Sequence, residues 1–363
     1  MAEHRNSIHI IQAMNSALKS KLFRKAIIKS AFYEIASFLH LISQKKYAKI
    51  TKKFHTILMD MLYRQQSNLH CDFSAIKNAI STRKLSILTP RTTEYNALAL
   101  ASVLKKHDYE VEIIFEYDSL ANIGDKKLYF VLCPDAFPKG LPHYYFVYNF
   151  EQSICKRWFS DFYLLKIANS IAIMDYAKVN IDFFRQHDFP EDKIYYIPLT
   201  PAAPDEKLIQ EKKIEAIFYG DANGARRKGP LARLQQTSGL RVIQNKYGDE
   251  MRQELNRSAI VVNIHNYENA ILETTRICEA VSHGCLVISE TSINDHEFPE
   301  LAKLIDFVPD GNTDAMEKRL QYWLSNPEKL REKLSSNQQL LSHTNSDFTQ
   351  NTEKLLRDYG LIR

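Results

Sequence analysis

Three charged residues recur at regular spacing in the segment LETTRICEAVSHG, where Glu273, Arg276 and Glu279 are each three positions apart. Residues three apart lie on one face of a helix, so these side chains can form one charged surface. A solvated row of ion pairs would have the same pattern. However, the segment lies between two apolar runs that we predict to be neighbouring strands, and ligands of open α/β sheets bind at the carboxyl ends of such strands. We therefore favour a ligand-binding role.

A second group of polar residues follows the apolar run IEAIFY. The turn contains Gly220 and Asn223, and three consecutive cations, Arg226, Arg227 and Lys228, stand where we predict a helix to begin. Backbone N–H groups at a helix N-terminus, beside guanidinium groups, suit a diphosphate. A solvated charge run on a surface helix is the alternative, and the nearby segment from Glu273 to Glu279 favours the binding role.

A third apolar run, AIVVNI, leads directly into His265 and Tyr267. Because both stand at the end of a predicted strand, both are candidates to contact the same ligand. Cys278, His283 and Cys285 are close in sequence but straddle a helix end and a strand start. We expect them to pack in the core rather than bind a metal.

Several common catalytic motifs are missing. The sequence contains no GxGxxG after the first strand, no GxxxxGK[ST], no HExxH and no GxSxG. These absences argue against a dinucleotide dehydrogenase, a P-loop NTPase, a zincin and an α/β-hydrolase. There is also no Asp-x-Asp, the motif by which one class of sugar transferases holds a metal.

The candidate residues need a scaffold that brings strand ends together. Apolar runs of five to seven residues alternate with helical segments or turns, which predicts parallel α/β sheets. One such series predicts a Rossmann-like domain over residues 81–199. The proline-rich segment 200–213 predicts a linker, a second series predicts another Rossmann-like domain over 214–345, and a helix over 346–363 ends the chain. The predicted fold class is α/β, with two domains facing a cleft.

Residues 1–80 differ from the rest of the chain. They hold 13 Lys and Arg against 4 Asp and Glu, a balance of +9, whereas the whole chain carries +5, so residues 81–363 carry −4. Apolar residues recur every three or four positions, which predicts a basic helical extension. Two interpretations of this extension are open: it binds an anionic membrane surface, or it is a solvated helical face that packs against the next domain. We expect no nucleic acid partner, since no stacking aromatics accompany the cations.

The cysteines and the hydropathy indicate the compartment. Five cysteines without CxxC spacing argue against a disulfide framework and for a reducing environment. No run approaches 18 apolar residues, and the N-terminus lacks the apolar core of a signal peptide. We expect a cytoplasmic protein, and the basic extension suggests peripheral attachment to the inner face of the membrane.

The order of these motifs resembles a known family. The turn after IEAIFYG, the segment LNRSAIVVNIHNYE and the segment LETTRICEAVSHGCLVISE resemble the donor-binding domain of group 1 glycosyltransferases of the GT-B fold, which are similar to the family 4 enzymes. The resemblance covers residues 200–310 well and residues 84–199 in architecture, and it does not extend to residues 1–80. It implies the GT-B arrangement of two Rossmann-like domains.

The resemblance also implies roles for single residues. The family's glutamate that holds the ribose of the nucleotide corresponds to Glu279, and its basic pair on the donor diphosphate falls among residues 226–228. Another family glutamate stands eight residues upstream of Glu279, where this chain has Ile271; the nearest acids are Glu273 and Glu268. A retaining and an inverting mechanism therefore both stay open.

Glycosyl transfer is the activity that this resemblance implies. The cations would neutralise the leaving diphosphate, so we expect no metal or other cofactor. An inverting enzyme also needs a base for the acceptor hydroxyl, and Glu94 and Glu151, each just beyond a predicted strand of the N-terminal domain, are the candidates, with Asp135 third.

The expected substrates are a nucleotide-sugar donor and a glycan or lipid-linked acceptor, in surface polysaccharide synthesis. One alternative is an epimerase of nucleotide sugars with the same fold. The other is a non-catalytic scaffold that binds a partner through the basic extension.

Overall fold

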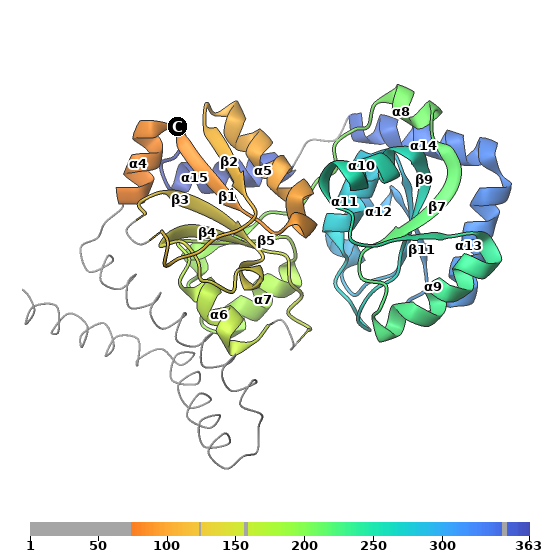
Figure 1. Cartoon of the computed structure of the whole chain (residues 1–363), viewed down its shortest axis with the longest axis horizontal. Coiled ribbons are helices and arrows are strands. Elements are labelled where there is room, and N and C mark those ends of the chain that lie inside the picture. Colours follow the sequence, from red (N-terminus) through yellow and green to blue (C-terminus); the bar gives the residue numbers. More distant parts are fainter. Residues whose placement is uncertain (1–73, 123–124, 156–158, 343–346) are drawn as a thin grey trace, which may run out of the picture.

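The computed structural model describes residues 74–122, 125–155, 159–342 and 347–363. Most of the basic helical extension predicted for residues 1–80 lies outside these ranges. The described chain forms two α/β domains, each built around its own parallel sheet (Figure 1).

The N-terminal domain is built on a six-stranded sheet with the order β2-β1-β3-β4-β5-β6. The strands are β1 (Lys84–Leu88), β2 (Glu110–Ile114), β3 (Leu128–Leu132), β4 (Tyr144–Asn149), β5 (Ile173–Asp175) and β6 (Ile194–Tyr196). Its helices are α4 (Ser74–Thr82), α5 (Glu94–Lys106), α6 (Asp161–Ala168) and α7 (Lys178–Gln186). Every residue of β3 is buried, which explains its continuous apolar run.

The C-terminal domain is built on a five-stranded parallel sheet with the order β11-β10-β9-β7-β8. The strands are β7 (Lys213–Tyr219), β8 (Arg241–Ile243), β9 (Ser258–Asn263), β10 (Leu286–Glu290) and β11 (Ile305–Val308). The helices are α8 (Glu206–Gln210), α9 (Ala225–Ser238), α10 (Gly248–Arg257), α11 (Thr274–Ser282), α12 (Pro299–Ala302), α13 (Thr313–Ser325) and α14 (Pro327–Ser342).

Two short helices lie outside the domain limits expected from the sequence. Helix α4, assigned in part to the basic extension, packs against β1 and β3 and buries Ala75, Ile76 and Ala79. Helix α8 occupies the predicted linker, but it packs against α14 and buries Ile209. The N-terminal domain therefore begins by Ser74, and the C-terminal domain includes α8.

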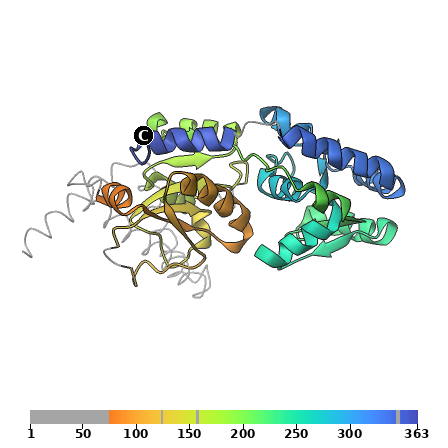
Figure 2. The same ribbon diagram turned by 90° about the horizontal axis from the view of Figure 1, so that it is seen from above.

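The last helix, α15 (Asp347–Asp358), belongs structurally to the first domain. It packs against α5 and β6, and Figure 2 shows it lying along the N-terminal domain, away from α14. The hydroxyl of Tyr109 donates a hydrogen bond to the carbonyl of Leu361 at 2.6 Å. Leu355 and Leu356 are fully buried. The chain therefore passes from the first domain to the second and back again.

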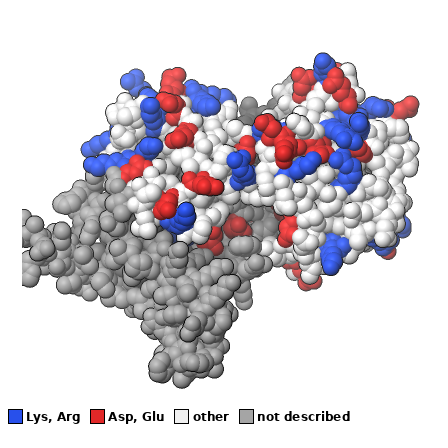
Figure 3. Space-filling view, in the orientation of Figure 1, with Lys and Arg blue, Asp and Glu red and all other residues white. Residues whose placement is uncertain are grey.

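The described surface carries charges of both signs. Figure 3 shows Lys and Arg side chains interspersed with Asp and Glu over the visible face of both domains. One cluster of contacting buried apolar side chains includes residues of both domains, among them Leu199, Ile271 and Leu355. Among the described helices, none is long and apolar enough to cross a membrane.

We predict that Leu356→Ala lowers the free energy of unfolding by about 2–5 kcal/mol, because it leaves a cavity between α15 and the N-terminal domain. Urea denaturation followed by circular dichroism measures this loss. Leu120→Ala is the matched control, since Leu120 is 76% exposed, and we expect its effect to stay within about 0.5 kcal/mol. Equal losses in the two variants would contradict the packing role of α15.

Candidate active site

A cavity of about 650 Å³ lies between the domains, at the carboxyl ends of strands from both sheets. This is the place where open α/β sheets bind ligands. Of the residues predicted from the sequence, those that line it are Glu94, Glu151, Gly220, Asn223, Arg227, Tyr267, Glu273, Arg276 and Glu279. The other three, Arg226, Lys228 and His265, are not among its lining residues.

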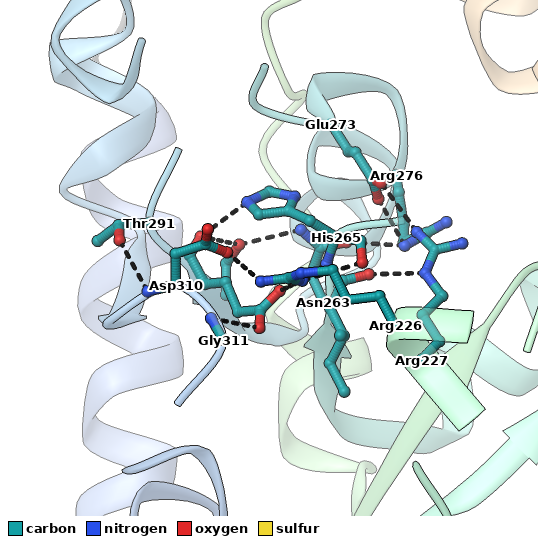
Figure 4. A network of polar contacts seen from close by, with 12 residues as sticks. Arg226, Arg227, Asn263, His265, Glu273, Arg276, Thr291, Asp310 and Gly311 are labelled. Carbon is teal, nitrogen blue, oxygen red and sulfur yellow. Dashed lines mark hydrogen bonds and ion pairs between the residues drawn. The ribbon is translucent and has the colours of Figure 1, made fainter. Parts of the chain in front are cut away.

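The three consecutive cations were expected together at one diphosphate, and the structure separates them. Arg227 is buried and lines the cavity, whereas Lys228 is exposed and lies outside it. Arg226 turns to the opposite side, where it pairs with Glu290 and Asp310 (Figure 4). The physical reason is that the three residues lie within α9, where successive side chains point about 100° apart.

The carboxylate of Glu273 joins two arginines (Figure 4), and all three residues line the cavity. Its oxygens lie 2.8 Å from Nη2 of Arg227 and 2.6 Å from Nη1 of Arg276. Burial alone would raise the pKa of Glu273, but Arg276 and Arg227 outweigh it and hold the pKa below its usual range. Two positive charges and one negative charge thus leave a net positive charge here. Glu273 is the N-cap of α11 rather than a member of its helical face.

Gly220 leaves room for one of these arginines. A Cβ atom at Gly220 would lie 2.9 Å from Nη2 of Arg276, and the backbone there has φ +120°. Both the close approach and the positive φ favour glycine. Arg276 also donates to Oδ1 of Asn263 at 2.7 Å, at the end of β9.

Glu279 also lines the cavity, six residues after Glu273 and within α11. One of its carboxylate oxygens lies 3.0 Å from the hydroxyl of Tyr219. Burial raises the pKa of Glu279 to about 7, and the bond from Tyr219 offsets part of that rise. A desolvated carboxylate on the cavity wall can accept hydrogen bonds from ligand hydroxyl groups.

Glu94 reaches the same cavity from the N-terminal domain. It is the first residue of α5, and its Oε1 lies 3.6 Å from Nη1 of Arg252 on α10. A Cβ atom at Gly248, the first residue of α10, would lie 2.9 Å from Oε2 of Glu94. Glu94 therefore already contacts the opposite domain.

Glu151 is the second acid on the N-terminal wall and follows β4. Burial, with a further contribution from the nearby Asp135, raises the pKa of Glu151 to about 7. A carboxylate with a pKa near 7 is well matched to general-base work at neutral pH. The third candidate base, Asp135, is not among the cavity residues; it pairs with the buried Lys166 at 3.1 Å.

His265 was expected to contact the ligand, and the structure corrects this. Its side chain is fully buried, and Nε2 lies 3.2 Å from the carbonyl oxygen of Glu290. Its backbone N–H donates to Oε2 of Glu290 at 2.7 Å. His265 thus belongs to the network around Arg226 (Figure 4), while Asn266 and Tyr267 line the cavity.

Some cavity residues were not identified from the sequence. Arg252, Tyr219 and Gln152 line it, although none was predicted to. Arg252 could have been suspected, because α10 follows β8 and begins at the edge where the strands end. Tyr219 appeared to be part of an apolar strand, and Gln152 carries no motif. Within the described ranges, no three His, Cys, Asp or Glu side chains gather in a way that would hold a metal ion.

Comparison with known proteins agrees with this geometry. Residues 208–356 match the model of a family described as glycosyl transferase-like. Among solved structures, the Anabaena protein HepE, in complex with UDP and glucose, is similar with a TM-score of 0.51 at 10% identity, over 76% of this chain and 99% of that one.

Two further structures are similar at lower scores. WaaG, a glycosyltransferase involved in lipopolysaccharide biosynthesis, has a TM-score of 0.48 at 9% identity, over 76% of this chain and 99% of that one. A putative UDP-N-acetylglucosamine 2-epimerase from Listeria monocytogenes has a TM-score of 0.47 at 9% identity, over 77% and 97%. None of the curated proteins matches the sequence.

The family match covers the domain that contributes Arg227, Glu273, Arg276 and Glu279 to the cavity. The two parallel sheets with a cavity between them are those of the GT-B fold. The chain therefore has the GT-B fold and contains a glycosyl transferase-like domain over residues 208–356.

Proposed function

We propose that the protein transfers a sugar from a nucleotide-sugar donor to the hydroxyl group of a glycan or lipid-linked acceptor, in the synthesis of a surface polysaccharide and without a metal. One observation carries this proposal. A single cavity has a net positive arginine pair and a desolvated glutamate on its C-terminal wall, and an acid with a raised pKa on its N-terminal wall.

The C-terminal wall suits a nucleoside diphosphate. Arg227 and Arg276 would bind the diphosphate and stabilise the charge that develops on it when it leaves. Glu279 would accept hydrogen bonds from the ribose hydroxyls. HepE, which shares the fold, is in complex with UDP and glucose, so UDP and UDP-sugars are the first ligands to test.

The N-terminal wall suits the acceptor. We assign Glu151 the role of general base, ahead of Glu94, because Glu94 is held by Arg252 on the opposite domain whereas burial keeps the pKa of Glu151 near neutrality. The base would take the proton of the acceptor hydroxyl as it attacks the anomeric carbon and the nucleoside diphosphate leaves. An epimerase would convert the donor with no acceptor present, so product analysis of the donor alone separates the two activities.

We predict that UDP, or failing that GDP, CMP or dTDP, stabilises the protein by about 2.7 kcal/mol at a hundredfold excess over its Kd. Glu279→Ala should weaken this binding about 10- to 100-fold, since hydrogen bonds to a charged group contribute about 1.5–3 kcal/mol. Titration calorimetry measures the Kd. Glu250→Ala, on the exposed first turn of α10, should bind like the wild type.

Glu273→Ala should behave differently from Glu279→Ala. It frees Arg227 and Arg276 to contact phosphate, so binding should fall less. The free energy of unfolding should fall by about 3–5 kcal/mol, because the buried Arg227 and the partly buried Arg276 lose their carboxylate. No stabilisation by any nucleotide, or equal binding by all these variants, would refute the donor assignment.

We predict that Glu151→Gln lowers kcat about 10²- to 10⁴-fold. The pH dependence supplies the stricter test. A base with a pKa of about 7 is ionised above that value, so the kcat of the wild type should rise as the pH rises through 7, and this limb should vanish in Glu151→Gln. If the limb survives there and vanishes in Glu94→Gln, Glu94 is the base and our assignment is wrong.

We also propose that the basic extension attaches the enzyme to an anionic membrane surface, as its balance of +9 over residues 1–80 suggests. The full chain should float with phosphatidylserine vesicles at about 20 mM salt and detach at about 500 mM. A variant shortened to begin at Ser74, which keeps α4 with its domain, is the control and should not float. If the full chain does not float with anionic vesicles at low salt, the proposed attachment is wrong.

A further inference from the structure

Gln152 joins the two domains through both groups of its side-chain amide. Its Nε2 donates to the carbonyl of Ile271 at 2.9 Å, and its Oε1 accepts from the N–H of Ile271 at 2.9 Å. Both residues are buried, with Gln152 only 8% exposed. The amide thus pairs with the backbone of the opposite domain in the way that one strand pairs with another. Because the site is buried, breaking either hydrogen bond leaves an unsatisfied polar group and costs free energy.

The residue before Gln152 is held rigidly by its own domain. The N–H of Glu151 donates to Oδ1 of Asn149 at 3.0 Å, and its carbonyl accepts from the amides of Asn149 and Asn180, each at 3.0 Å. Both asparagines are fully buried and donate to Asp175. The backbone around Glu151 is therefore a stiff extension of β4 that ends in the cross-domain hydrogen bonds.

The other end of this connection leads to the donor wall. The N–H of Leu272, next to Ile271, donates to Oδ1 of Asn294 at 2.9 Å. The residue after Leu272 is Glu273, which holds Arg227 and Arg276. One pair of hydrogen bonds thus connects the segment that carries Glu151 with the segment that carries the arginine clamp.

We propose that Gln152 is a positioning residue, whose hydrogen bonds to Ile271 hold Glu151 against the donor wall and keep water away from it when the domains are together. This inference rests on the proposed function of the site. While these two hydrogen bonds are formed, the base and the leaving-group clamp have one relative placement. When they break, the cavity opens, and Glu151 becomes hydrated and moves away from the acceptor hydroxyl.

The surroundings of Glu151 are compatible with such a change. Among the described residues, titratable groups that interact with Glu151 include Cys133 beyond β3, Asp135, Tyr163 on α6 and Tyr176 beyond β5, each from the N-terminal domain. Asp135 is paired with Lys166. The desolvation of Glu151 is thus the property that opening of the domains would change, and hydration lowers the pKa of a buried acid.

Hydrogen–deuterium exchange tests the cross-domain hydrogen bonds without reference to catalysis. In Gln152→Ala, the Ile271 amide has no acceptor on the opposite domain, so exchange in a peptide covering residues 268–273 should be at least about tenfold faster than in the wild type. Ser282→Ala is the matched control. It removes another cross-domain bond, between the hydroxyls of Tyr95 and Ser282 at 2.9 Å, and should leave this peptide unchanged.

The pH–rate profile then tests the positioning role, with UDP affinity as a control. Gln152→Ala should lower kcat about 10- to 100-fold and leave the Kd of UDP within about twofold, because the donor residues belong to the other domain. The limb near pH 7 should move to lower pH by about one unit or more. Ser282→Ala should keep the wild-type kcat and limb.

Three results would overturn the proposal. The first is unchanged exchange at Ile271 in Gln152→Ala. The second is faster exchange with kcat and the limb as in the wild type. The third is the same shift of the limb in Ser282→Ala, which would mean that any loosening of the domains has this effect. Failure of the proposed function is recognised separately, as a wild type that binds no nucleotide and transfers no sugar.

Discussion

The donor wall of the cavity depends on one carboxylate. Glu273 lies between two guanidinium groups that would repel each other without it, and each arginine in turn holds parts of the backbone. Arg227 donates to the carbonyls of Asp221 and Ile264, and Arg276 reaches Asn263 and lies against Gly220. The loops after β7 and β9 and the start of α11 are therefore assembled around a single buried acid.

The neighbouring residue Arg226 also forms ion pairs with carboxylates, but these ion pairs hold strand ends together and do not line the cavity. It pairs with two acids, Glu290 and Asp310, at the ends of β10 and β11, so its charge is more than balanced. Arg227 and Arg276 share one acid between them. The arginine pair on the cavity wall therefore outnumbers its acid, whereas the acids around Arg226 outnumber the cation.

Much of the fold could be predicted because parallel strands covered on both faces leave continuous apolar runs, as in β3 and β9. The expectation that residues near the carboxyl ends of strands meet at one site correctly placed Glu94, Glu151 and Glu279 at one cavity. It could not choose among residues 226–228, since that choice depends on where α9 begins. It also placed His265 in the site, whereas the backbone turns that side chain inward.

Gln152 could not be found at all, because its partner Ile271 lies 119 residues away and its role appears only when the domains are together. The sequence analysis also assigned α4 to the extension and α8 to the linker, for a similar reason. Each helix is short, and only its packing shows to which domain it belongs.

The return of α15 to the first domain has a consequence for how the chain is made. The strands of the N-terminal sheet leave the ribosome early, but α15, which packs on α5 and β6, is synthesised only after the whole second domain. Leu355 and Leu356 bury an apolar surface of the first domain in the folded protein. This surface stays exposed to solvent while the second domain is translated. The first domain is therefore complete only when α15 has been made, and a nascent chain that stops before α15 has two sheets but only one complete domain.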